Sequence, residues 1–360
     1  MFSLVLLLAA ARLSAQNSDP VTALRELDRL NQGAQAGDPK AMFELGLHHL
    51  RTDTAQGMVE ARRWITKSAE AGFAEAQYSL GVVTEPGGAE AVGWYRKAAE
   101  QGHARAQARL GEIYAEGQLI APDLAEARRW HERAAAQGVG SSETALAMMY
   151  ENGAGVEQDF VKAFELYQKA ANRGDARAMV RLGDLHFYAR GVRQNMGEAF
   201  KWYRNAGLQK LPAAYVKLGI CYERGFGIGQ DFREAARYYE KGAAAGDKTA
   251  QAALGRFYEE GLGLKQDYEQ AALYYRMAAE QGEPFAQLSL ASLYRKGLGV
   301  AKDNVTALMW LHLSAAQGQG EAVRDLLART MSAKDVEESQ RRAEELNSRV
   351  AGVKTNAPGR

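Results

Sequence analysis

The residues of this 360-residue chain that could perform chemistry do not lie at catalytic or metal-binding spacings. Of the six histidines, only His48 and His49 are adjacent, and neighbours on a helix point about 100° apart, which disfavours shared metal binding. The sequence contains no HExxH pattern. The single cysteine, Cys221, occupies a position that is apolar in other copies of an internal repeat, which favours a buried, unreactive thiol. We therefore expect structural roles for these side chains.

Glycine-rich loops and serine motifs give no catalytic signature either. Gly-x-Gly occurs at 225–227 and 261–263, but without the lysine of a phosphate-binding loop or the strand-to-helix context of a dinucleotide site. These loops are interpreted as turns. No G-x-S-x-G is present, and no serine has lysine three residues later. The sequence thus predicts a protein that is not an enzyme, with no catalytic residues, metal or cofactor.

The charge balance narrows the classes of partner. There are 45 Lys and Arg against 44 Asp and Glu, a net charge of +1, whereas nucleic-acid binders usually carry a basic surplus. A hydrophobic content of 46% and a charged content of 25% are typical of a packed soluble protein. One cysteine allows neither an internal disulfide nor a four-cysteine zinc site. We expect no nucleic-acid partner.

An apolar run at residues 2–11 is followed by Arg12, Leu13, Ser14 and Ala15. Ten apolar residues are too few to span a bilayer, which needs about 20, so no membrane span is expected. The run fits a signal peptide at 1–15, cut after Ala15, and predicts a periplasmic or secreted protein. No Lys or Arg precedes the run, so a misassigned start or a frayed terminus of a cytoplasmic protein is the alternative.

The chain is built on an internal repeat with two aligned columns. All five tryptophans lie in one column, at Trp64, Trp94, Trp130, Trp202 and Trp310. The other copies of that column hold Leu166, Tyr238 and Tyr274. From Trp94 onward the step is 36 residues, after a first step of 30. The second column is the leucine of an L-[G/A] pair, at Leu45, Leu80, Leu110, Leu146, Leu182, Leu218, Leu254 and Leu290. A fixed period of this length predicts a solenoid of stacked units.

Each unit reads as a helical hairpin. In the first helix of one unit, Ala178, Leu182 and Leu185 share a face with Gly183, whose missing side chain should allow a partner helix to approach closely. A second helix over 160–173 has apolar residues at helical spacing, and the aromatic column is expected to supply its bulk against neighbouring units. Short acceptor side chains precede the second helices and should cap them, at Asp123, Asp159, Asn195, Asp231, Asp267 and Asp303.

The combined columns read A-x-x-x-L-G-x-x-Y-x-x-G-x-G-[VIL]-x-x-D-x-x-x-A-x-x-[WY]-Y-x-[KR]-A-A-x-x-G and resemble the Sel1-like repeat family. The resemblance covers about eight units and implies an all-α, right-handed superhelical solenoid of α-helical hairpins related to tetratricopeptide repeats. The 36-residue period favours this family over the 34-residue tetratricopeptide unit. Three segments depart from the pattern: 52–59 lacks the Gly-x-Gly loop, 85–93 is about six residues short, and 210–212 lacks the helix-ending glycine.

The repeat also defines the expected domain organisation. A capping helix is expected within 16–36, the solenoid of eight repeats at 37–318, C-terminal capping helices within 319–349, and a disordered tail at 350–360. The closing helices are expected at 321–329 and 333–349, the second starting with a capping box of Ser332 and Asp335.

One exposed stripe of the first helices is the candidate partner-binding surface. It comprises the positions six and two before, and one and five after, the glycine of the L-G pair. Over eight units it holds ten Lys or Arg and six Asp or Glu, so it is mildly basic, although an ordinary solvated face would look similar. The candidate binding residues are Arg105, Arg109, Arg177, Arg181, Tyr188, Lys217, Arg224 and Arg256.

The predicted function is a non-enzymatic, monomeric scaffold that binds a partner protein with an acidic surface. The resemblance implies that bacterial relatives often act as adaptors outside the cytoplasm. One alternative is a secreted hydrolase of the cysteine-rich, β-lactamase-like type, but those relatives carry paired cysteines that this chain lacks. Another is a cytosolic regulatory subunit, if the leader is not cleaved.

Overall fold

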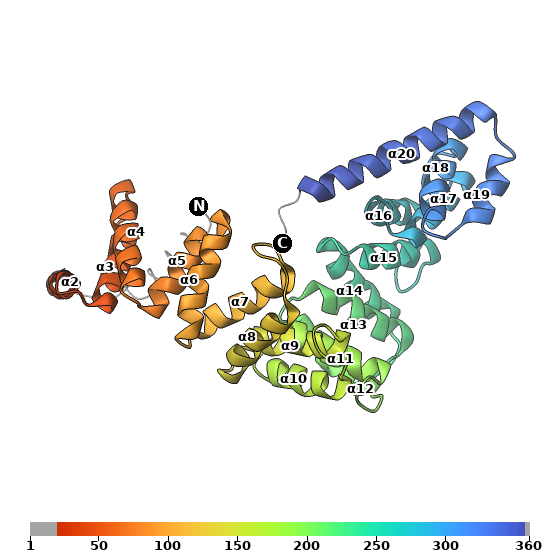
Figure 1. Cartoon of the computed structure of the whole chain (residues 1–360). Coiled ribbons are helices and arrows are strands. Elements are labelled where there is room, and N and C mark those ends of the chain that lie inside the picture. The colour runs from red at the N-terminus through yellow and green to blue at the C-terminus, as the bar shows by residue number, and fades with distance from the viewer. Residues whose placement is uncertain (1–19, 357–360) are drawn as a thin grey trace. The chain divides into compact units, whose positions relative to one another are not determined.

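The computed structural model describes residues 20–356, which form α-helices joined by short connections, with no strand in that range (Figure 1). The all-α solenoid of helical hairpins is thereby confirmed. The predicted leader at 1–15 lies outside the described residues. None of the described helices is long and apolar enough to cross a membrane.

The helices fall into two compact units, the first ending at Asp175 and the second beginning at Ala176. Each repeat packs mainly on its neighbours, so the apolar core of each unit is a series of local clusters. The first unit contains α2 (Pro20–Gln35), α3 (Pro39–Arg51), α4 (Ala55–Glu70), α5 (Ala74–Thr84), the 3₁₀ turn η1 (Glu85–Gly87), α6 (Ala89–Glu100), α7 (Ala104–Glu116), α8 (Leu124–Ala136), α9 (Gly140–Asn152) and α10 (Phe160–Asn172).

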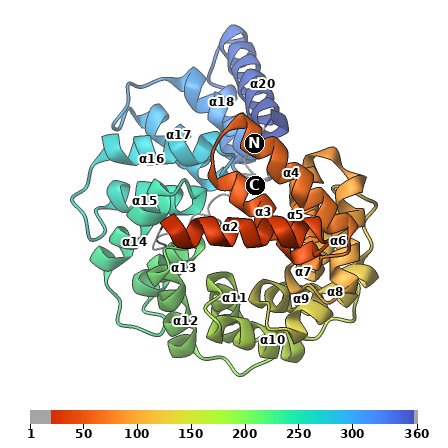
Figure 2. The same cartoon turned by 90° about the vertical axis from the view of Figure 1, so that its left-hand side faces the viewer.

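The second unit continues the same alternation of first and second helices, and its successive hairpins lie side by side (Figure 2). It contains α11 (Ala176–Tyr188), α12 (Met196–Leu208), α13 (Pro212–Arg224), α14 (Phe232–Ala244), α15 (Lys248–Glu260), α16 (Tyr268–Glu280), α17 (Pro284–Lys296), α18 (Asn304–Ala315), α19 (Glu321–Ala328) and α20 (Ala333–Asn356).

The loop inside each hairpin is closed by backbone and capping contacts. Gly225 ends α13 in the left-handed conformation, with φ of 73°. The amide of Asp231 then donates to the carbonyl of Tyr222 at 2.8 Å, and its carboxylate accepts the amides of Arg233 and Glu234, which begin α14. The predicted caps are confirmed at Asp123, Asp159, Asn195, Asp267 and Asp303 as well.

The second glycine of the Gly-x-Gly loop is fixed by packing between repeats. Gly227 has a φ of 73°, and a Cβ there would lie 2.1 Å from the carbonyl oxygen of Met196, at the start of the preceding second helix. Gly263 and Gly299 meet backbone atoms of Phe232 and Tyr268 in the same way. The loops are turns, as predicted, and they are also contacts between repeats.

The most deeply buried rings follow the tryptophan column by one residue. Tyr95, Tyr167, Tyr203, Tyr239 and Tyr275 are at most 2% exposed. In the tryptophan column itself, Trp130 and Trp310 are buried, whereas Trp64, Trp94 and Trp202 are half-buried. The column supplies part of the buried bulk, as expected, and the tyrosines that follow it supply more. A Cβ at Gly183 would lie 2.5 Å from a ring carbon of Tyr203. The glycine therefore permits a close approach, as predicted, but the approaching group is a tyrosine ring.

The C-terminal helices agree with the predicted start of α20 but not with its predicted end. Ser332 accepts the amide of Asp335 at 3.2 Å, which confirms a serine cap at the start of α20. The backbone of α20 then continues to Asn356, whereas the sequence predicted a helix that ends at Arg349 and a disordered tail from 350. From Ala333 onward the first proline is Pro358, and Gly352 alone does not end the helix.

Candidate protein-binding face

The first helices carry all eight candidate binding residues, two on α7 in the first unit and six on α11, α13 and α15 in the second. Five of them are exposed: Arg105, Arg177, Arg181, Tyr188 and Arg224. The other three are half-buried, with 25–28% of the side chain exposed: Arg109, Lys217 and Arg256. The structure thus separates five exposed candidates, of which Arg224 also lies 3.4 Å from Glu223, from three half-buried candidates that we call the engaged group.

The ion pairs of the engaged group depend mainly on a column of acidic residues. This column lies four positions after the glycine of the L-G pair. Glu223 is 7% exposed and accepts a hydrogen bond from the hydroxyl of Tyr239 at 2.7 Å. Equivalent bonds join Tyr95 to Glu85, Tyr167 to Glu151 and Tyr275 to Glu259, at 2.6–2.8 Å. Burial, together with the adjacent carboxylate, raises the pKa of Tyr239 well above its ordinary value.

One repeat uses a different acid for the same purpose. Phe187 fills the acidic column there, and Asp184, one turn earlier on α11, accepts the hydroxyl of Tyr203 at 2.7 Å. The buried tyrosine therefore keeps an anionic partner although the column has lost its carboxylate. Burial and Asp184 raise the pKa of Tyr203.

The engaged cations complete these tyrosine–acid pairs from the following repeat. Arg256 Nη2 lies 2.8 Å from Glu223, and Lys217 Nζ lies 2.7 Å from Asp184. Arg109 binds Glu85 in the same manner. These three candidates therefore join neighbouring repeats, and their charges are satisfied within the molecule.

The acidic column also changes the charge of the face. The column adds four glutamates to the six acids of the stripe, and one cation, Arg295, to its ten basic residues. Stripe and column together therefore hold ten acids and eleven basic residues. The mildly basic stripe inferred from the sequence is thus nearly neutral as a folded surface. Local charge still varies, because two of the four column glutamates are buried and two are half-buried, whereas Arg177 and Arg181 are exposed.

The exposed candidates gather most clearly on α11. Arg177 and Arg181 are one helical turn apart, and Tyr188, 53% exposed, lies at the end of the same helix. Lys217 of α13 approaches this tyrosine, with its ammonium 5.8 Å from the ring centroid. The structure therefore combines an aromatic side chain with cations from two helices, a composition common at protein interfaces.

Cys221 and one of the six histidines are enclosed in the core, whereas the other five histidines are half-buried. Cys221 is 1% exposed, as predicted, and burial raises the pKa of its thiol to about 12. His131 is 2% exposed, its Nδ1 lies 3.2 Å from Ser142 Oγ, and burial lowers its pKa to about 4. Across residues 20–356, no cluster of three or more His, Cys, Asp or Glu could hold a metal ion.

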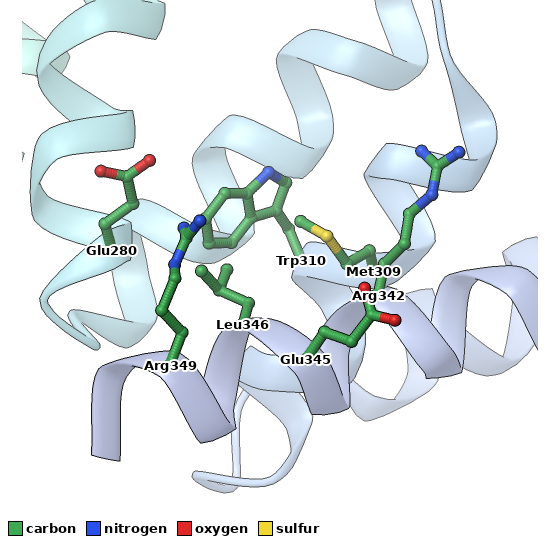
Figure 3. Close-up of a pocket in the computed structure, with 7 residues that line it drawn as sticks. All are labelled: Glu280, Met309, Trp310, Arg342, Glu345, Leu346 and Arg349. Carbon is green, nitrogen blue, oxygen red and sulfur yellow. The ribbon is translucent and has the colours of Figure 1, made fainter. Parts of the chain in front are cut away.

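A hollow of about 470 Å³ lies between the last repeat and α20 (Figure 3). Met309, Trp310 and Leu346 form its apolar part, and Arg349 is a further lining residue on α20 (Figure 3). Arg342 at its edge donates to Glu338 at 2.7 Å, so this cation is satisfied within the capping helix. The hollow follows the seam between repeat and cap.

Comparison with known proteins agrees with the repeat boundaries. The Sel1 repeat family model matches residues 39–73, 74–103, 104–139, 140–175, 176–210, 212–247, 248–283 and 284–319. A Sel1 repeat protein from Oxalobacter formigenes is 30% identical, with a TM-score of 0.67 over 88% of this chain and 95% of that one. A protective antigen of uropathogenic Escherichia coli strains, displaying an SLR fold, is 25% identical, with a TM-score of 0.55 over 96% and 98%. The search of curated proteins gave no match.

Proposed function

Because the chain belongs to the Sel1 repeat family, whose members are generally protein-interaction scaffolds, we propose that it is a non-enzymatic scaffold that binds a protein along its first helices. The observation that carries this proposal is the contrast between columns. The buried column of Met149, Leu185 and Cys221 stays apolar although its residues differ, whereas the stripe changes in charge and size, from Arg181 to Lys217 to Ala253. A stripe that differs in charge and size between repeats can match the surface of a particular partner protein.

The face of α11 is the proposed centre of binding. Arg177, Arg181 and Tyr188 are exposed, and arginine and tyrosine are enriched among the residues that dominate interface energies. The engaged cations of the face hold its helices in register and do not serve as the primary contacts. A partner with an acidic surface fits the exposed arginines by charge.

The proposed location is the bacterial cell envelope, in the periplasm or outside the cell. The leader-like residues 1–15 support it, and the description of the E. coli relative as a protective antigen agrees with a place outside the cytoplasm. The intact mass of the protein purified from its own host provides the test. A mass lacking the first 15 residues is expected, and a full-length mass would contradict export.

Site-specific photocrosslinking tests the binding face. A photoreactive phenylalanine analogue replaces Tyr188 on α11 or, as a control, Lys201 on α12, whose side chain is 62% exposed. After irradiation in envelope extract, a partner should be crosslinked at position 188 and not at position 201. If the partner protein were crosslinked only at position 201, binding would lie on the second helices, and the proposed face would be contradicted.

A further inference from the structure

One repeat lacks the ring that the others place between their helices. Leu166 on α10 stands where every other repeat has Trp or Tyr. In two repeats of the second unit, the ring of this column stacks on a tyrosine of the first helix. Tyr238 lies 5.6 Å from Tyr222, and Tyr274 lies 5.7 Å from Tyr258, with the planes within 12° of parallel. Tyr150 is the corresponding tyrosine beside Leu166, which offers it no ring.

A groove of about 270 Å³ opens at this position, between α8, α9 and α10 of the first unit. Its apolar walls are formed by Ala135, Leu146, Tyr150 and Leu166. Pockets for drug-sized ligands are usually larger, at about 300–1,000 Å³. The size suits a single large side chain.

The rim of the groove carries two lysines. Lys169 follows Leu166 by three residues, the position from which Lys97 lies 4.1 Å over Trp94 and Lys241 lies 4.9 Å over Tyr238. In this repeat the column holds no ring for that ammonium to cover. Lys162, on the same helix, lies 4.3 Å from the ring centroid of Tyr150.

The carboxylates at the groove are ion-paired with arginines. Glu132 pairs with Arg128 at 3.2 Å, and Glu143, only 3% exposed, pairs with Arg173 at 3.2 Å. Glu132 also acts electrostatically on Lys162, as does Asp159. The four cations still outnumber these three acids, so the groove combines an aromatic wall with a small excess of positive charge.

We propose that this groove binds an aromatic side chain within an acidic segment of the partner protein. The incoming ring packs against Tyr150 in the space that Leu166 leaves, and Lys169 covers it as its counterparts cover the rings of other repeats. Carboxylates that flank the ring pair with Lys162 and Lys169. The inference rests on the proposed function in taking the occupant to be a protein, but it concerns a different unit and a different surface from the α11 face.

Methyl NMR titration of the full chain tests the inference with a synthetic probe, the peptide Ac-Asp-Trp-Asp-NH₂. Saturable shifts are expected at the methyl groups of Ala135, Leu146 and Leu166. The peptide Ac-Asp-Leu-Asp-NH₂ should bind at least about fivefold more weakly, because it supplies no ring. Lys169→Ala should weaken binding of the tryptophan peptide about two- to fivefold, the effect of losing an exposed charge pair.

Two variants separate loss of the groove from loss of the fold. Leu166→Trp restores the residue common in this column, and filling the groove should weaken peptide binding at least about tenfold without lowering the melting temperature. Lys162→Glu with Lys169→Glu changes only exposed side chains, and should transfer preference to Ac-Lys-Trp-Lys-NH₂. Tyr238→Leu opens the matching position beside Lys241 and Tyr222, and should create weak binding in the second unit.

The absence of saturable shifts at the groove up to about 10 mM peptide, which corresponds to negligible affinity, would overturn the inference. So would equal binding by the wild type and Leu166→Trp. Either result leaves the proposed function standing, because that is tested by crosslinking at position 188. Conversely, failure of that crosslink would leave peptide binding at the groove unaffected.

Discussion

Removing the hydroxyl of Tyr239 tests the buried tyrosine–acid pairs that hold the binding face together. In Tyr239→Phe the ring remains against Gly219, but Glu223 loses the hydrogen bond it accepts at 2.7 Å. Hydrogen bonds to charged groups contribute about 1.5–3 kcal/mol when buried. Glu223 keeps Arg256 at 2.8 Å, so the larger penalty for an unpaired buried charge does not arise. The free energy of unfolding should therefore fall by about 1.5–3 kcal/mol.

Urea denaturation followed by circular dichroism gives this value from the midpoint, provided that the slope of the transition is unchanged. Tyr238→Phe is the matched control, because the neighbouring ring is half-buried and its stacking on Tyr222 is retained by phenylalanine. The control should stay within about 0.5 kcal/mol of the wild type. Equal costs for the two variants, or no cost at Tyr239, would refute the role assigned to the pair.

Three further predictions follow from the buried titratable groups. Because the pKa of Tyr239 is raised in the folded protein, its proton is released on unfolding above pH 10. The free energy of unfolding should therefore fall as pH rises past 10, by up to about 1.4 kcal/mol per pH unit for this tyrosine. Denaturation of Tyr239→Phe should show a shallower dependence on alkaline pH. His131, with its pKa lowered to about 4, binds a proton on unfolding between pH 4 and 6.5. The free energy of unfolding should decrease by about 3 kcal/mol as pH falls through that range. His131→Phe should flatten this dependence of stability on pH. Cys221, buried and with a pKa of about 12, should react with a maleimide orders of magnitude more slowly in the native than in the denatured protein, and rapid native labelling would contradict its placement.

The fold was predictable because the same local signals recur in every repeat. Helix ends were found from Asp or Asn before second helices and from glycine after first helices, and these side chains act within one or two turns of their own position. The buried place of Cys221 followed from its column alone. Such properties depend on local sequence and period, which a single chain displays eight times.

The contacts between columns were harder to predict. Tyr239 and Glu223 are 16 residues apart, as are Tyr167 and Glu151, so the spacing was present in the sequence as a signal that was not used. Asp184 could not be found in this way, because it replaces the missing acid from a different position. Recognising such a replacement requires knowing how the two helices lie relative to one another.

The eight candidate binding residues were chosen by their place on one face of the first helices. Helical phase placed Arg109, Lys217 and Arg256 on the same face as Arg181, but phase says nothing about the acid that the preceding repeat brings beside each one. The groove at Leu166 was equally hidden. In the sequence, Leu166 is one more member of a column, and only the stacked rings of other repeats show what space its side chain leaves open.

The most direct test of the scaffold is the affinity of the crosslinked partner for the double variant Arg177→Glu with Arg181→Glu. Two attractions become repulsions, so the loss should exceed the about 1 kcal/mol of an ordinary surface ion pair, a factor of more than about five in Kd. Wild-type binding should weaken as ionic strength rises, since salt screens exposed charges. The charge reversals Lys201→Glu and Arg204→Glu on α12 are the control and should leave Kd unchanged. We predict this loss with a melting temperature close to that of the wild type, and an unchanged Kd in the α11 variant would contradict binding on this face.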